Sequence, residues 1–165
     1  MPGQSLVEEQ LTHSIIGAFY EVYKSLGFGF LENVYTLALE HEIEGRGHRV
    51  ARELPVRVLY KGRELCTQRL DMVVDGKVIV EVKSTYHLHP SADRQFYSYL
   101  RASNLEVGLL LHFGRQASFY RLFCANTRAR PLTRPQLQRI DLPRPDPDGD
   151  LSPESPRSQR PARGE

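Results

Sequence analysis

The sequence predicts an α/β fold in which helices flank a mixed central β-sheet. Two N-terminal segments repeat apolar residues at helical spacing, and three strand-like runs separated by Lys-Gly and Asp-Gly turns follow them. One further helical segment then precedes two more strand-like runs. The predicted element order is therefore ααβββαββ, and interspersed helices and strands of this kind pack as layers around one core.

The helices are expected over residues 5–27, 31–47 and 89–104, where apolar residues recur at steps of three and four. Ser5 and Ser91 stand at expected N-caps, and Gly27 follows the end of the first helix. The buried face of the first helix is expected to comprise Leu11, Ile15, Phe19, Val22 and Leu26. That of the second is expected to comprise Leu31, Val34, Leu37 and Ala38.

The strands are expected over residues 48–62, 63–74, 77–84, 105–114 and 117–124. Proline cannot donate a hydrogen bond to a sheet, so Pro55 confines the first strand to an edge or a bulge.

Composition divides the chain into one globular domain, residues 1–125, and a tail, residues 126–165, rich in Pro, Arg, Asp and Ser. The tail has too few large apolar residues to offset the entropy of ordering, so we expect it to be disordered. Residues 1–126 carry 14 basic and 14 acidic residues, and the tail carries 8 arginines and 6 acids. A strongly basic nucleic-acid footprint is thus absent, and binding would need a local patch, a metal ion or the tail.

The sequence argues against a protein stabilised by disulfides or zinc, and against a membrane protein. Cys66 and Cys124 are the only cysteines and lie far apart, which gives neither a disulfide framework nor a zinc-binding spacing. Apolar stretches of the roughly 20 residues that cross a membrane are absent, and the N-terminal residues show no basic start followed by an apolar run, so we expect a cytoplasmic protein with no membrane partner.

Charged residues interrupt the apolar strand after the Asp75-Gly76 turn. Strand alternation places Glu81 and Lys83 on the face opposite the one formed by Val78, Val80 and Val82. In the preceding strand it places Asp71 opposite the face formed by Leu70, Met72 and Val74. If both apolar faces serve one core, then Asp71, Glu81 and Lys83 converge on the other side of the sheet.

The turn decides whether this convergence occurs. A two-residue turn at Asp75-Gly76 pairs Asp71 with Val80 and separates the two carboxylates, whereas a three-residue turn or a bulge pairs Asp71 with Glu81. We therefore expect an odd loop or a bulge at residues 75–77.

Two carboxylates on neighbouring strands suit Mg²⁺ or Mn²⁺, which prefer oxygen ligands. A lysine beside them would orient an attacking water or stabilise charge on a phosphate. From the hairpin alone, an ordinary surface salt-bridge ladder among Asp71, Glu81 and Lys83 remains an open alternative.

The same residues resemble the core pattern of the PD-(D/E)XK nuclease superfamily, an acid on one strand followed by Glu-x-Lys on the next. "GFLENVY" is similar to the motif of the bacterial GxxExxY group, through Gly29, Glu32 and Tyr35. "QFYSY", with Gln95 and Tyr99, resembles the Gln-x-x-x-Tyr pattern of RecB-like nuclease domains. The resemblance spans about residues 6–123 and implies a restriction-endonuclease-like core.

The resemblance also implies roles for individual residues. Asp71, Glu81 and the Val82 carbonyl would hold the metal, Lys83 would position or activate water, and Glu32 would be an additional acid beside the metal. Gln95 would support the site or contact phosphate, with Tyr99, Tyr35 and Gly29 in supporting positions. The chain departs from the pattern at His112, where an asparagine is expected, and in the linker "GFGF" before Glu32.

Together these observations predict a metal-dependent nuclease that hydrolyses DNA. The alternative is a non-catalytic nucleic-acid-binding or protein-interaction module that keeps the fold. A protein partner bound through the tail, and a homodimer, are both left open by the sequence.

Overall fold

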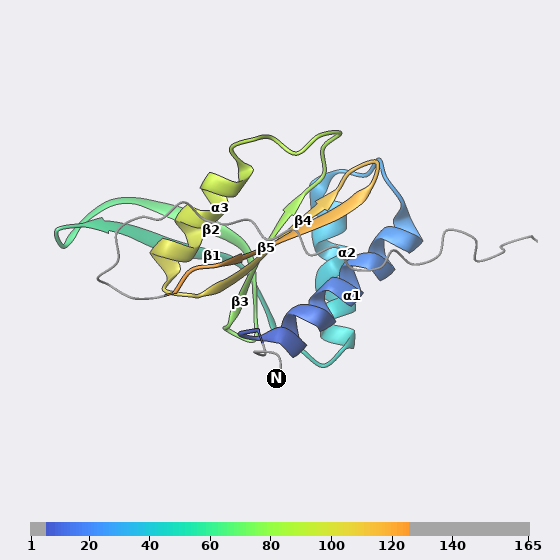
Figure 1. Ribbon diagram of the computed structural model, residues 1–165, viewed down its shortest axis with the longest axis horizontal. Helices are drawn as coiled ribbons and strands as arrows, with labels where there is room; N and C mark the ends of the chain where they lie inside the picture. Colours follow the sequence, from blue (N-terminus) through green and yellow to red (C-terminus); the bar gives the residue numbers. More distant parts are fainter. Residues whose placement is uncertain (1–5, 126–165) are drawn as a thin grey trace, which may run out of the picture.

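The computed structural model describes residues 6–125, and its elements follow the predicted order (Figure 1). The helices are α1 (Glu9–Leu26), α2 (Glu32–Gly45) and α3 (Ala92–Ser103). The strands are β1 (Val50–Tyr60), β2 (Arg63–Val74), β3 (Val78–Lys83), β4 (Val107–Phe113) and β5 (Ala117–Phe123). Helix α1 begins later than expected, with Glu8 as its N-cap, so the prediction of Ser5 at this position is wrong. Ser5 and the tail at 126–165 lie outside the described residues.

The five strands form one mixed sheet, as the sequence predicts, and their spatial order is β1-β2-β3-β4-β5. Strands β3 and β4 are parallel, joined through α3, and the other neighbours are antiparallel. Helices α1 and α2 cover one face of the sheet and α3 covers the other, each over its own apolar cluster (Figure 1). Strand β1 is an edge strand, which accommodates Pro55 opposite Arg69.

Close side-chain contacts hold the helices against the sheet. On the α1 and α2 side, the rings of Tyr35 and Phe113 stack at 4.2 Å and both are fully buried. On the α3 side, Phe96 lies so close to Gly108 of β4 that a Cβ there would meet its ring at 2.5 Å. Glycine is therefore required at 108 for α3 to approach the sheet.

Helix α2 buries a different face from the one expected. Leu31 is 80% exposed and Leu37 is 48% exposed, whereas Tyr35, Leu39 and Ile43 are fully buried. The buried residues recur at steps of four, so they form one stripe against α1 and the sheet. Apolar residues occur on both sides of this helix. Of the four residues expected on its buried face, Ala38 packs against the cluster, partly buried, whereas Leu31, Val34 and Leu37 are exposed.

The turn between β2 and β3 has the expected odd length. The ladder pairs Val74 with Val78 and Met72 with Val80, which leaves residues 75–77 as a three-residue connection. Asp75 and Gly76 both have positive φ, and the Lys77 N–H donates to the Val74 carbonyl at 3.0 Å. The register prediction is confirmed, and extending this register places Asp71 opposite Glu81.

Strand β2 is distorted next to Asp71, contrary to the simple alternation expected. Leu70 lies in the α3-side cluster, whereas Met72 and Val74 lie in the cluster on the other face. Glu53, which the β1–β2 register places opposite Asp71, has a φ of 52°. A residue in the left-handed region interrupts the pleat, so alternation does not carry through this point.

The β2–β3 turn is anchored to α1 through a histidine. The Asp75 carboxylate bonds His48 Nδ1 at 2.8 Å and accepts the Arg49 N–H at 2.8 Å, and His48 Nε2 lies 2.9 Å from Ser14 Oγ. These hydrogen bonds lower the pKa of Asp75 below its usual value, and the bond from the Arg49 N–H contributes most. Ser14 lies within α1, where the neighbouring backbone N–H groups are hydrogen-bonded within the helix. They are therefore not free to stabilise an oxyanion, and this Ser-His-Asp chain holds the turn in place.

Candidate active site

Asp71 occupies the point where β2 and β3 separate. The ladder between these strands ends at the pair of Met72 and Val80. Beyond it, the Val82 N–H donates to Asp71 Oδ2 at 3.0 Å. The carboxylate thus replaces a backbone acceptor, which fixes it beside the strand that carries Glu81.

Glu81 is a buried carboxylate whose two oxygens have different surroundings. The residue is 3% exposed, and Oε1 accepts a hydrogen bond from Lys83 Nζ at 2.8 Å. Oε2 is buried and has no hydrogen-bond partner among the described residues. Burial, and then the negative charge of Asp71, raise the pKa of Glu81 to about 7, against the opposing effect of Lys83.

Lys83 is half-buried and points to the same side of the sheet. Burial alone would lower its pKa, but the hydrogen bond and charge of Glu81, with Glu32 and Asp71, outweigh burial and raise the pKa. In the metal-free protein, Lys83 is therefore an ammonium group that neutralises part of a carboxylate cluster.

Glu32 and the α3 residues approach this cluster from two other elements. Glu32 begins α2, and its charge acts on both Glu81 and Lys83. From α3, Tyr99 lies near enough that the charge of Glu81 adds to burial in raising the pKa of its hydroxyl. Gln95 Nε2 donates to the Tyr99 hydroxyl oxygen at 2.9 Å, so the two side chains act as a pair.

Tyr35 and Gly29 position the linker rather than joining the charged cluster. The Tyr35 hydroxyl donates to the Gly27 carbonyl at 2.6 Å and accepts the Phe30 N–H at 3.2 Å. Gly29 has a φ of 123°, a conformation that a side chain would strain. Both features shape the chain immediately before α2, and so determine where Glu32 enters the site.

His112 fills the position at which the resemblance suggests asparagine. It pairs with Lys83 across the parallel strands and is buried. Its Nε2 lies 2.8 Å from the Thr85 carbonyl and 3.2 Å from Thr85 Oγ1, and its Nδ1 lies 3.4 Å from Ser118 Oγ. The imidazole therefore holds the segment that follows Lys83 in place.

The donor set fits a metal that needs few protein ligands. Within residues 6–125, no group of three or more His, Cys, Asp and Glu side chains is arranged to hold a metal ion. Asp71 and Glu81 are two carboxylates on adjacent strands, and the unpartnered Glu81 oxygen is the kind of group that a cation would satisfy. Mg²⁺ usually keeps several waters and takes one or two carboxylates, which matches this pair.

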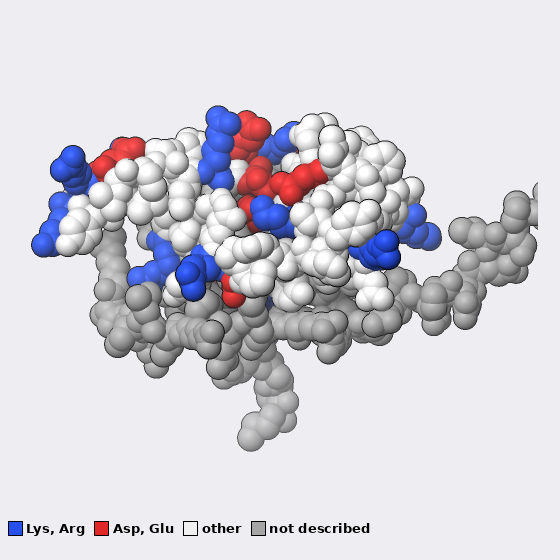
Figure 2. Space-filling view, turned by 90° about the horizontal axis from the view of Figure 1, so that it is seen from above, with Lys and Arg blue, Asp and Glu red and all other residues white. Residues whose placement is uncertain are grey.

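Acidic side chains dominate the centre of the face toward which β3 ends. Figure 2 views the molecule from that side and shows Asp and Glu gathered in the middle, with Lys and Arg beside them and toward the edges. An acidic centre repels a phosphate backbone, so a polyanionic ligand would need an intervening cation there.

A mixed sheet with this carboxylate pair and Glu-x-Lys strand defines the restriction-endonuclease-like class of nuclease folds. The chain belongs to the PD-(D/E)XK nuclease superfamily, whose family model matches residues 9–122. Members of the superfamily typically use divalent metals.

Other comparisons add little beyond the family. The crystal structure of SSO0001 is similar to this chain with a TM-score of 0.45 and 18% identity, over 69% of this chain and 57% of that one. This chain thus corresponds to only part of SSO0001. No curated protein matches the sequence. No helix in the part of the chain that the structure describes is both long and apolar enough to cross a membrane.

Proposed function

We propose that this protein is a metal-dependent nuclease of the GxxExxY group that hydrolyses phosphodiester bonds in DNA with Mg²⁺ or Mn²⁺. The observation that carries the proposal is the buried Glu81 oxygen without a hydrogen-bond partner, next to the Asp71 carboxylate. A buried acidic oxygen left in this state is costly unless a ligand satisfies it.

Asp71, Glu81 and the Val82 carbonyl would hold the metal. The Val82 N–H already bonds the Asp71 carboxylate, so this stretch of backbone is fixed beside both acids. When bound, a divalent metal would polarise a phosphate oxygen and lower the pKa of a coordinated water.

Lys83 and Glu32 would act on the substrate side of the site. The Lys83 ammonium group lies 2.8 Å from Glu81, where it would donate hydrogen bonds to the attacking water or to a phosphate oxygen as negative charge develops. Glu32 is exposed at the start of α2, and its carboxylate would orient water in the second coordination sphere or accept a proton.

Gln95 would contact the phosphate backbone from the exposed side of α3. Its bond to the Tyr99 hydroxyl fixes one end of its amide, and Tyr99 is packed near Glu81. The amide is therefore held at the edge of the carboxylate cluster, in a position to donate to a bound strand.

The contacts of Gly29 and Tyr35 support the assignment to the GxxExxY group. Gly29 allows the linker conformation, Tyr35 bonds both Gly27 and Phe30, and Glu32 lies between them in sequence. Each residue of the motif thus has its own task in this chain: Glu32 carries the charge, and Gly29 and Tyr35 position it.

The test is a cleavage assay with purified full-length protein and Mn²⁺ or Mg²⁺ on single-stranded, double-stranded and branched DNA, and on RNA. Cleavage by the parent protein should disappear with EDTA and fall at least 100-fold in Lys83→Ala, a loss typical of removing a group that stabilises transition-state charge.

The matched control is Lys77→Ala. Lys77 precedes the same strand but lies at its opposite end, where its side chain is 58% exposed and contacts Glu8 at 3.5 Å. This variant should cleave like the parent. Equal activity of the Lys83→Ala and parent proteins would overturn the proposal. Absence of cleavage with intact nucleic-acid binding would favour the non-catalytic module.

A further inference from the structure

Aromatic side chains are exposed beside the candidate active site. Tyr86, in the loop from β3 to α3, is 63% exposed, and Phe30, in the linker before α2, is 47% exposed. Large apolar side chains grouped at a surface commonly mark a binding site. Tyr86 follows Lys83 by three residues, so this surface adjoins the carboxylate cluster along the chain.

Three segments contribute to one aromatic and cationic group. The rings of Phe28 and Tyr86 meet edge to face, with centroids 5.1 Å apart. The Arg115 guanidinium, from the β4–β5 turn, lies 5.4 Å from the centre of the Tyr86 ring. The linker, the β3–α3 loop and the β4–β5 turn thus meet at Tyr86.

Hydrogen bonds hold each of these segments in place. Ser84 Oγ donates to the Phe30 carbonyl at 2.6 Å, which ties the end of β3 to the linker. The Tyr23 hydroxyl lies 2.8 Å from the Arg115 carbonyl and 3.1 Å from that of Gly114, which ties the β4–β5 turn to α1. The group is therefore fixed relative to the site before any ligand binds.

We infer that Phe28, Tyr86 and Arg115 form a stacking surface for an unpaired nucleobase, so that the substrate is single-stranded DNA. The inference rests on the proposed nuclease function, because it names the form of nucleic acid that the same site receives. Aromatic rings and arginine planes are the groups on which single-stranded bases stack.

The charge distribution favours single strands over duplex. Residues 6–125 carry equal numbers of basic and acidic side chains, 14 of each, so they offer little of the phosphate neutralisation on which duplex binding depends. Stacking does not need net charge, and Arg115 adds a cation to contact the adjacent phosphate.

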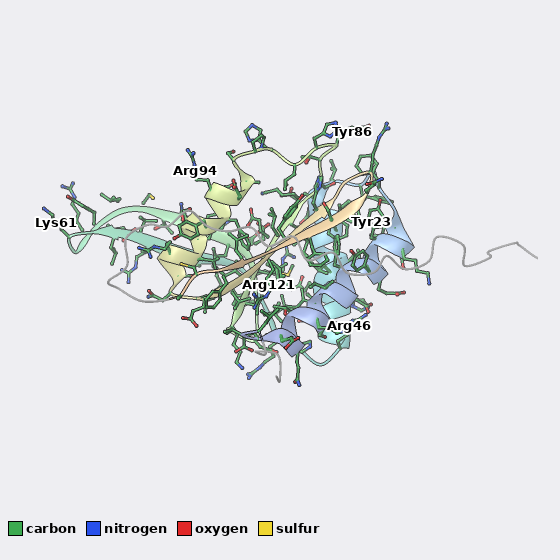
Figure 3. All side chains as sticks on the ribbon, viewed as in Figure 1. Tyr23, Arg46, Lys61, Tyr86, Arg94 and Arg121 are labelled. Atoms are coloured by element: carbon green, nitrogen blue, oxygen red, sulfur yellow. The ribbon has the colours of Figure 1, made fainter. Side chains whose placement is uncertain are left out.

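The chain contains a matched control for this surface. Tyr60 is 59% exposed, and Lys61 lies 5.4 Å from its ring centre, so residue type, exposure and cation distance nearly equal those at Tyr86. This pair lies at the tip of the β1–β2 hairpin, where Figure 3 labels Lys61 far from Tyr86. Tyr60→Ala therefore removes a similar aromatic group away from the site.

The experiment measures binding to the full-length protein without cleavage. Fluorescence anisotropy with Ca²⁺ in place of Mg²⁺ would follow a labelled 12-nucleotide oligothymidylate and a 12-base-pair duplex. The parent should bind the single strand more tightly than the duplex. Tyr86→Ala should weaken single-strand binding about tenfold or more, and Arg115→Ala should weaken it as well, whereas Tyr86→Phe and Tyr60→Ala should bind like the parent.

A second measurement, of base fluorescence, detects stacking directly. An oligonucleotide with 2-aminopurine should lose fluorescence on binding the parent protein and keep it with Tyr86→Ala. Preference for duplex, no single-strand binding, or equal effects of Tyr86→Ala and Tyr60→Ala would overturn the stacking surface, even if the protein cleaves DNA. Conversely, Tyr86-dependent binding without cleavage under any metal would uphold the surface and reject the proposed nuclease function.

Discussion

Replacing Glu81 with glutamine should stabilise the metal-free protein at alkaline pH. The pKa of Glu81 rises from 4.5 to about 7 on folding, so the folded state binds a proton more tightly than the unfolded state does. Between these two values, stability falls as pH rises, because ionisation of Glu81 is resisted only in the folded state. At about 1.4 kcal/mol per pKa unit, the penalty above pH 7 is on the order of 3 kcal/mol.

Glutamine removes this penalty and keeps the shape of the side chain. Lys83 would lose a charged partner but keep an amide oxygen as acceptor, so the gain should be somewhat smaller than the full penalty. Thermal unfolding of Glu81→Gln and parent in EDTA, measured from pH 4 to pH 8, should show melting temperatures that agree closely at pH 4, below both pKa values. They should diverge by several degrees at pH 8.

Glu44→Gln is the matched control, because Glu44 is exposed on α2 and its replacement should leave the profile of the parent unchanged. Added Mn²⁺ should raise the melting temperature of the parent at pH 8 and have little effect on Glu81→Gln. If Glu81→Gln were less stable than the parent at pH 8 in EDTA, the ionised Glu81 carboxylate would not destabilise the folded state, and the inference from its burial would be wrong.

Three other substitutions test separate parts of the structure. Tyr35→Phe removes the donor to the Gly27 carbonyl, so urea unfolding should show a loss of about 1 to 3 kcal/mol and the cleavage rate should fall as Glu32 is misplaced. Gly108→Ala puts a methyl group 2.5 Å from the Phe96 ring, and should lower the free energy of unfolding by about 1 to 3 kcal/mol in the same assay. Asp71→Asn should abolish the calorimetric signal of Mn²⁺ binding while the far-ultraviolet circular dichroism spectrum stays that of the parent.

The element order and the carboxylate pair could be predicted because local signals specify them. Lys-Gly and Asp-Gly turns delimit the first three strands, and the apolar alternation of β3 assigns Glu81 to one face. The three-residue connection follows from positive φ at Asp75 and Gly76, residue types that accept this conformation.

Other features depend on contacts between distant segments. The apolar stripe of α2 that becomes buried is chosen by α1 and Phe113, because Leu31 and Tyr35 are both suitable from the local pattern. The distortion that moves Leu70 to the α3 side arises at Glu53 on the neighbouring strand. Local periodicity cannot report either effect.

The hydrogen bonds that anchor the site could not be predicted from the sequence either. His48 reaches Asp75 and Ser14 across separations of 27 and 34 residues, and His112 reaches Thr85 across 27. A hint was present in the position of His112 within an otherwise apolar strand, since a buried polar residue needs partners. Its partners, however, are defined only once β4 lies beside β3.

The position of a bound metal ion tests the central claim most directly. Crystals of the protein grown with Mn²⁺ would be measured near the manganese absorption edge, and the anomalous difference map calculated. We predict a peak in contact with the Glu81 oxygen that has no partner in the metal-free fold and with the Asp71 carboxylate. A fully active protein whose manganese peak lies elsewhere, or whose Glu81 oxygen remains without a metal, would contradict the account.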